Sequence, residues 1–361
     1  MPRPAATSSR ISRHPRLLRV RGALFPLVRC GTAFLVCWLL TCLALRALQP
    51  LPPVPQVREK LEWLAAAPAE YDTLFVGSSR VRRHLSPKHF DETMRALGQP
   101  TSSFNLGIDA MTFPELGYVL KASLERVQSP LRYVILDINP LRRRLKKGSD
   151  LRSLREIHWH DLEHTALACS AVLHHFGAGK DPLSKTLSLL ATHATLMVRY
   201  YESTGGGTEL LATRLLERDS QLQPMGRHGR GFFPVAATMD LHSAEEYREE
   251  LDEMRALEER PRQDAPVLER ALAQICEEVR AAGATPVLLV SPVISSTKLP
   301  LPVDHPTRPM VIAFDDPERF PDLYDPANRY DRQHLNLAGA RLLTRRVAEA
   351  VADHSDASTH R

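Results

Sequence analysis

Four short apolar runs separated by helical patterns constrain the fold more than any other feature of this sequence. The runs cover residues 73–76, 102–106, 133–138 and 286–291. Near-continuous apolar strands that alternate with helices are typical of a parallel sheet covered on both faces. The sequence therefore predicts an α/β domain over residues 70–352, and we find no internal repeat in it.

Local signals place the helices between these strands. Ser86 and Pro87 start one helix, as a capping residue followed by a proline in the first turn, and Gly98 ends it. Helical periodicity predicts further helices at 57–66, 114–127, 264–282 and about 337–353. Residues from 141 to about 262 interrupt the alternation with helical, histidine-rich and polar sequence. We interpret them as an insertion between the third and fourth strands.

The positive charge of the chain belongs to its N-terminal tail. Residues 1–46 contain eight arginines and no acidic residue, whereas residues 47–361 contain 39 basic and 42 acidic residues, a net charge of −3. Nucleic-acid binding requires a basic face on the folded domain, so we expect no nucleic-acid partner. A basic tail beside an apolar stretch instead indicates orientation in a membrane.

Residues 22–45 form an apolar stretch of 24 residues, interrupted by Arg29. At ~1.5 Å per residue this stretch spans a hydrocarbon core of about 30 Å, and the long Arg29 side chain can reach the interface. The sequence predicts a transmembrane signal-anchor at 22–45, a cytoplasmic basic tail at 1–21 and an exported domain, periplasmic in a Gram-negative host. The alternative is a cleaved signal peptide, but no small-x-small site follows the stretch, because Arg46 separates Ala44 from Ala47.

A proline-rich linker and a short helix occupy residues 46–69, and residues 353–361 are expected to form a C-terminal tail. Three of the five cysteines lie in the apolar stretch. The other two, Cys169 and Cys276, form one disulfide or remain two free thiols, and the sequence leaves both alternatives open.

Polar residues follow each predicted strand, where an open parallel sheet carries its functional loops. These loops read Gly77-Ser78-Ser79-Arg80, Asn105-Leu106-Gly107, Asp137-Ile138-Asn139-Pro140 and Ser291-Pro292. Asp331 and His334 stand just before the last predicted helix. A serine hydroxyl needs a base to become a nucleophile, and an aspartate three residues from a histidine can hold its other ring nitrogen.

This order of Ser, Gly, Asn and Asp-x-x-His resembles the SGNH (GDSL-like) hydrolase superfamily over about residues 70–140 and 284–352. The resemblance implies a three-layer, flavodoxin-like α/β domain with Ser79 as nucleophile, His334 as general base and Asp331 as its partner. It also implies an oxyanion hole made by the backbone N–H groups of Ser79 and Gly107 and the side-chain amide of Asn139. No cofactor and no metal are expected.

The blocks depart from the usual family pattern. Gly-Asp-Ser is replaced by Gly77-Ser78-Ser79, and Gly-x-Asn-Asp by Asp137-Ile138-Asn139-Pro140. This framing is similar to that of the membrane-associated branch, which includes alginate and cell-wall O-acetyltransferases and the D-alanyl transfer proteins of teichoic acid. The resemblance then implies an acyl esterase or O-acyltransferase that acts on an acylated glycan or lipid-linked envelope substrate, beside a membrane-bound O-acyltransferase.

Three alternatives are weighed against this hypothesis. An α/β-hydrolase elbow requires Gly-x-Ser-x-Gly, but Val81 occupies the second glycine position. A non-catalytic envelope protein of the same fold would bind polymer or scaffold a membrane acyltransferase. A metallohydrolase would use His158, His160 and Asp161, with His164 on the same helix face as His160. Separately, the basic run 142–147 is a candidate binding site for an anionic polymer or lipid headgroups.

Overall fold

A computed structural model describes residues 16–48, 51–142, 153–179, 181–203, 229–255, 260–261, 265–295, 297–298 and 309–359. The chain separates into two compact units, Met1–Pro50 and Leu51–Arg361. Each unit is described by itself.

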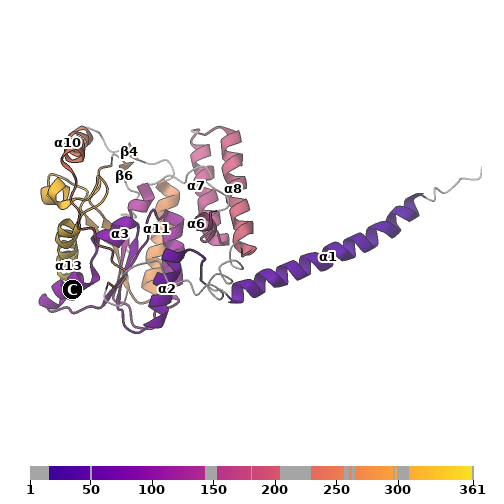
Figure 1. Ribbon diagram of the computed structural model, residues 1–361, viewed down its shortest axis with the longest axis horizontal. Helices are drawn as coiled ribbons and strands as arrows, with labels where there is room; N and C mark the ends of the chain where they lie inside the picture. Colours follow the sequence, from indigo (N-terminus) through magenta and orange to yellow (C-terminus); the bar gives the residue numbers. More distant parts are fainter. Residues whose placement is uncertain are drawn as a thin grey trace, which may run out of the picture. The chain divides into compact units, whose positions relative to one another are not determined.

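The first unit contains one long helix, α1 (Arg16–Leu48) (Figure 1). Its segment Val28–Leu48, with a mean hydropathy of 1.9, is long and apolar enough to cross a membrane. The helix extends beyond the predicted stretch at both ends, and Pro26 lies inside it. The apolar segment begins six residues later than predicted, so that Arg29 stands at its edge.

The second unit is built on a five-stranded sheet in which all neighbouring strands are parallel. The strands follow the order β2-β1-β3-β5-β7 and comprise β1 (Thr73–Gly77), β2 (Ser103–Gly107), β3 (Tyr133–Asp137), β5 (Thr285–Val290) and β7 (Met310–Ala313). Four of them match the predicted runs to within one residue at each end. The edge strand β7 was not predicted, because a four-residue run that is only partly buried carries little periodic signal.

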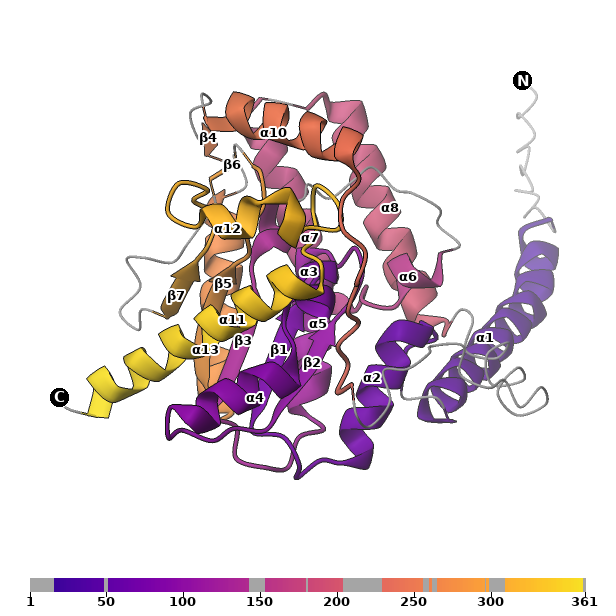
Figure 2. The same cartoon turned by 60° about the vertical axis from the view of Figure 1, so that its left-hand side comes forward.

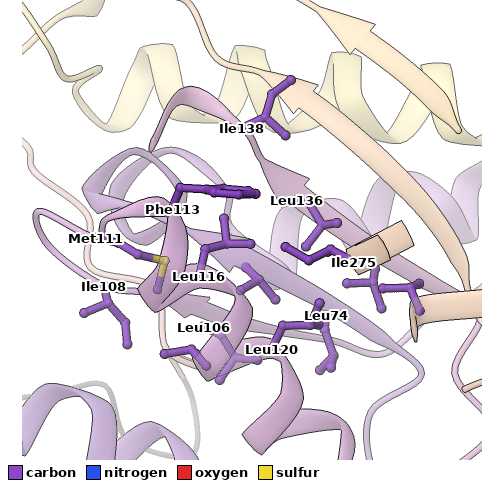
Figure 3. Packing of buried hydrophobic residues seen from close by; sticks show 14 of the residues in the cluster. Leu74, Leu106, Ile108, Met111, Phe113, Leu116, Leu120, Leu136, Ile138 and Ile275 are labelled. Carbon is purple, nitrogen blue, oxygen red and sulfur yellow. The ribbon is translucent and has the colours of Figure 1, made fainter. Parts of the chain in front are cut away.

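Helices cover both faces of this sheet (Figure 2). One face carries α2 (Pro55–Ala66), α5 (Phe113–Leu124) and α11 (Ala265–Ala281), and the other carries α3 (Ser79–His84), α4 (Pro87–Ala96) and α13 (Leu337–Thr359). Alternate strand residues enter the two cores, so Leu74 and Val76 lie in one and Phe75 in the other. Figure 3 shows the first core, where Leu74, Leu106 and Leu136 face Leu116, Leu120 and Ile275.

Local capping explains where several helices begin. The Ser86 hydroxyl accepts from the His89 N–H at 3.4 Å with Pro87 in the first turn, as predicted for α4. Thr112 and Glu115 form a capping box at the start of α5. The last helix, α13, extends to Thr359. The helix therefore continues six residues past its predicted end at about residue 353.

The insertion after β3 is helical, as predicted. It begins with the 3-10 turn η1 (Asn139–Arg142) and contains α6 (Leu154–Ile157), α7 (Leu162–Gly177), α8 (Leu183–Tyr201) and α10 (Leu241–Arg255). Helices α7 and α8 lie side by side, and α7 contacts α5 and α11 (Figure 1). A second small sheet joins β4 (Arg260–Pro261) to β6 (Thr297–Lys298). Cys169 on α7 and Cys276 on α11 are both free thiols.

Residues 229–240, an extended segment that we call the strap, lead into α10 and connect the insertion to the rest of the domain (Figure 2). The Arg230 carbonyl accepts from the Asn105 N–H at 2.9 Å, on the outer edge of β2. Further along, the Phe233 N–H donates to the Arg82 carbonyl at 2.9 Å and the Met239 N–H to the Arg329 carbonyl at 2.9 Å. The strap thus covers the edge strand and reaches the loop before α13.

Candidate active site

Ser79 lies at the start of α3, directly after the carboxyl end of β1. Ser78 is the N-cap residue of this helix. A side chain at Gly77 would place its Cβ 2.5 Å from the Asp137 Cβ and 2.6 Å from Val81 Cγ2. Only glycine allows the tight turn from β1 into α3. Ser79 is therefore held where β1 and β3 are neighbours and the strand order reverses, the usual position of ligand sites in open parallel sheets.

Three residues predicted from sequence meet in one hydrogen-bonded chain. Ser79 Oγ lies 2.8 Å from His334 Nε2, across 255 residues of sequence. His334 Nδ1 lies 2.8 Å from Asp331 Oδ2 and 2.9 Å from Asp331 Oδ1. An ionised carboxylate only accepts, so Nδ1 carries the proton and Nε2 presents a lone pair to the serine hydroxyl. This is the tautomer that a general base requires.

The Asp331 carboxylate also shapes the loop that carries His334. Asp331 Oδ1 accepts the backbone N–H groups of Gln333 at 2.7 Å and of His334 at 2.8 Å. Burial opposes ionisation of this carboxyl, but its hydrogen bonds with His334 and the backbone outweigh that effect and lower the pKa of Asp331. Asp331 is therefore ionised at neutral pH.

A buried arginine, Arg329, supports the loop that carries Asp331 and His334. The fully buried Arg329 guanidinium donates to the carbonyls of Leu323 at 2.8 Å, Arg332 at 3.1 Å and Asp331 at 3.4 Å. It lies 5.0 Å above the centre of the Tyr247 ring, on α10 of the insertion. Burial lowers the pKa of Arg329. The loop is thus fixed by main-chain contacts to a cation, and the insertion contributes to its support.

Asn139 follows β3 and is buried beside the carboxylate of Asp137. The Asn139 Nδ2 group donates to Asp137 Oδ1 at 2.7 Å, and the Asn139 backbone N–H donates to the same oxygen at 3.2 Å. The hydroxyls of Ser78 and Ser291 donate to Asp137 at 2.9 and 3.3 Å. Asp137 therefore sets the orientation of the Asn139 amide, a role that the sequence did not reveal.

Close packing of α3 against β2 requires a glycine at position 107. A Cβ at this position would lie 2.1 Å from the backbone nitrogen of Arg82, so the missing side chain lets α3 pack directly on β2. The Gly107 N–H donates to Asn105 Oδ1 at 2.8 Å. To bind an oxyanion, this N–H has to exchange the Asn105 acceptor for the substrate. Ser79 heads its helix, so its own N–H has no acceptor within the helix.

His158 and His164 of the insertion are engaged in separate contacts. His158 Nε2 lies 3.0 Å from Glu115 Oε1, and His164 Nδ1 lies 2.7 Å from Asp161 Oδ1. His160 precedes the N-cap Asp161 of α7, so it does not share a helix face with His164, contrary to the prediction. Among the described residues, no group of three or more His, Cys, Asp or Glu side chains is arranged to hold a metal ion. In the basic run 142–147, residues 143–147 lie outside the described residues.

Comparisons of the sequence with protein families and with curated proteins give no relative for this chain. No family model matches it, and a search of curated proteins finds no match. The fold and the site together define an α/β protein with a Ser-His-Asp chain at the carboxyl edge of a parallel sheet.

Proposed function

We propose that this protein is an SGNH-type acyl esterase or O-acyltransferase, anchored in a membrane by α1. The observation that carries the proposal is the hydrogen-bonded chain Ser79–His334–Asp331, with 2.8 Å between Ser79 Oγ and His334 Nε2. The order of the sequence blocks and the strand order β2-β1-β3-β5-β7 support a flavodoxin-like SGNH domain.

The proposed reaction begins with attack of Ser79 Oγ on the acyl carbonyl of an ester. His334 Nε2 takes the serine proton as the bond forms, and ionised Asp331 stabilises the resulting imidazolium. The Asn139 amide and the N–H groups of Ser79 and Gly107 are the proposed donors to the oxyanion. His334 then returns the proton to the departing alcohol oxygen, which leaves an acyl group on Ser79.

The acyl-serine is resolved by a hydroxyl group. His334 takes the proton of water or of an acceptor alcohol, the new oxygen attacks the acyl carbonyl, and Ser79 Oγ leaves with the proton. Water makes the protein an esterase, and a sugar hydroxyl makes it an O-acyltransferase. The basic tail and the apolar span of α1 support a cytoplasmic N-terminus and an extracytoplasmic domain. We therefore propose an acylated glycan or lipid-linked envelope molecule as substrate and a membrane-bound O-acyltransferase as partner.

Covalent labelling with a serine-directed fluorophosphonate tests the nucleophile. The full chain in membranes is expected to be labelled, Ser79→Ala to lose the label, and Ser86→Ala, which alters only a helix cap, to keep it. Equal labelling of the wild type and Ser79→Ala, or labelling of neither, contradicts the assignment. Incubation with acyl donors, with and without glycan acceptors, then separates hydrolysis from transfer.

A second candidate is a non-catalytic envelope protein that keeps the fold to bind polymer or scaffold an acyltransferase. The observation in its favour is the Gly107 N–H, which already donates to Asn105 Oδ1. This candidate predicts no fluorophosphonate label on the wild-type protein and retained binding of acylated polymer in Ser79→Ala.

A further inference from the structure

The short helix α3 contacts the loop of His334 at both of its ends. Ser79, its first residue, meets the His334 imidazole, and His84, its last, meets the backbone of the next residue of the loop. The Leu335 N–H donates to His84 Nε2 at 2.9 Å, and both residues are fully buried. One short helix of six residues therefore spans both contacts.

We propose that His84 is a positioning residue, whose Nε2 lone pair anchors the Leu335 N–H and thereby holds His334 at hydrogen-bonding distance from Ser79. The inference rests on the proposed function, because it assigns a supporting part to the same site.

The hydrogen bond from Leu335 determines the protonation of His84. A backbone N–H can only donate, so His84 Nε2 must be unprotonated and the ring proton must sit on Nδ1. Nδ1 has no hydrogen-bond partner among the described residues. A second proton, on Nε2, would place an N–H donor of His84 against the Leu335 N–H, and the hydrogen bond between them would be lost. The geometry thus requires a neutral imidazole.

The surroundings favour the same neutral state. Burial lowers the pKa of His84 well below its usual value, and the positive charges of Arg329, Arg80 and Arg83, and of His334 when it is protonated, act in the same direction. The ring centres of His84 and His334 are 5.9 Å apart. A charged His84 would oppose protonation of His334 during the reaction, whereas a neutral one anchors the loop without that repulsion.

The main chain of His84 is held independently of its ring. The Thr344 hydroxyl on α13 donates to the His84 carbonyl at 2.9 Å, and the same hydroxyl accepts from the Ser86 N–H at 3.1 Å. A change of the His84 side chain therefore leaves these backbone contacts available. This separates the role of the imidazole from the packing of α3 on α13.

Two variants of the full chain in membranes test the imidazole. His84→Leu keeps a buried side chain but removes the acceptor, whereas the amide oxygen of His84→Gln replaces the Nε2 lone pair with an acceptor that never protonates. We expect His84→Leu to slow fluorophosphonate labelling of Ser79 at least tenfold, and His84→Gln to restore it to within about threefold of the wild type.

Hydrogen–deuterium exchange supplies a readout that does not depend on chemistry. Exchange in a peptide covering 330–336 is expected to accelerate in His84→Leu and not in His84→Gln, while peptides of β1 and β3 keep wild-type exchange. Wild-type labelling of His84→Leu, unchanged exchange at 330–336, or loss of protection throughout β1 and β3 each overturns the positioning role. Absence of label in the wild-type protein contradicts the proposed function alone, because the exchange measurement still tests the anchor.

Discussion

The Ser78 hydroxyl donates to the buried carboxylate of Asp137 at 2.9 Å, and this bond joins the ends of β1 and β3 directly behind Ser79. The same carboxylate accepts from the Asn139 amide. One acidic side chain therefore links the residue that precedes the candidate nucleophile to a candidate oxyanion donor.

Replacement of this carboxylate tests whether that link matters. Asp137→Asn is expected to reduce fluorophosphonate labelling at least tenfold, because an amide has one acceptor oxygen, whereas the carboxylate accepts from Asn139 with one oxygen and from Ser78 with the other. Loss of an acceptor for buried donors costs about 1–3 kcal/mol. Asp72→Asn is the matched control, since Asp72 accepts hydrogen bonds just before β1, at the opposite end of the strand. Wild-type labelling of Asp137→Asn would show that Asn139 needs no such support.

Asp331 is predicted to act through the tautomer of His334. Asp331→Asn is expected to lower turnover of an acyl donor at least tenfold, because an amide can favour the wrong imidazole tautomer. Asp325→Asn serves as the control, since Asp325 caps the short helix η2 (Pro326–Asn328), which follows α12 (Pro321–Tyr324), and accepts the Ala327 N–H at 2.9 Å. Turnover of Asp331→Asn close to that of the wild type would remove Asp331 from the triad.

The pair His160–His193 predicts a loss of stability in mild acid. The His160 Nδ1–H donates to the Glu156 carbonyl at 2.5 Å, so its Nε2 accepts from His193 Nδ1 at 3.0 Å. Burial, together with the charge of His193 in the case of His160, lowers the pKa of His160 to about 3, and burial lowers the pKa of His193 to about 4.

The direction of this pH dependence follows from proton uptake by the unfolded chain, whose histidines titrate near pH 6.5. The contribution of these two histidines to the free energy of unfolding is fully present above about pH 6.5. It falls as the pH drops from there towards 4, by up to about 1.4 kcal/mol per pH unit for each histidine. Thermal unfolding followed by tryptophan fluorescence measures this slope. The double variant His160→Phe/His193→Leu is expected to flatten it, and the exposed His242→Gln to leave it unchanged. An equal slope in the double variant would contradict the prediction.

Gly231 is predicted to be essential for the strap. Its φ is +82°, and a Cβ would lie 2.0 Å from the Asn105 carbonyl oxygen. Gly231→Ala is expected to cost clearly more than Gly179→Ala, which has φ +72° and open space around it and so isolates the backbone penalty of about 1 kcal/mol. Unfolding free energies of the two variants measure the difference. Equal values would mean that the strap moves away without cost.

The periodicity of the sequence was sufficient to predict most of the sheet. Strands β1, β2, β3 and β5 and the start of α4 lie where apolar runs and a Ser-Pro pair predict them, because burial patterns and helix caps depend on residues close in sequence. The same local logic missed β7, which depends on pairing with β5.

The candidate site, too, could be predicted from the sequence only in part. Ser79, Asn139, Asp331 and His334 were selected from sequence because the order of their blocks resembles the SGNH superfamily and because a serine nucleophile needs a base. Only the tertiary structure decided which groups support them. The Leu335 N–H on His84, the Arg329 guanidinium under the loop and the Asn105 acceptor of Gly107 carry no sequence signature. The first of these contacts joins residues 251 positions apart, and such a contact is determined by how the helices pack on the sheet rather than by any local pattern.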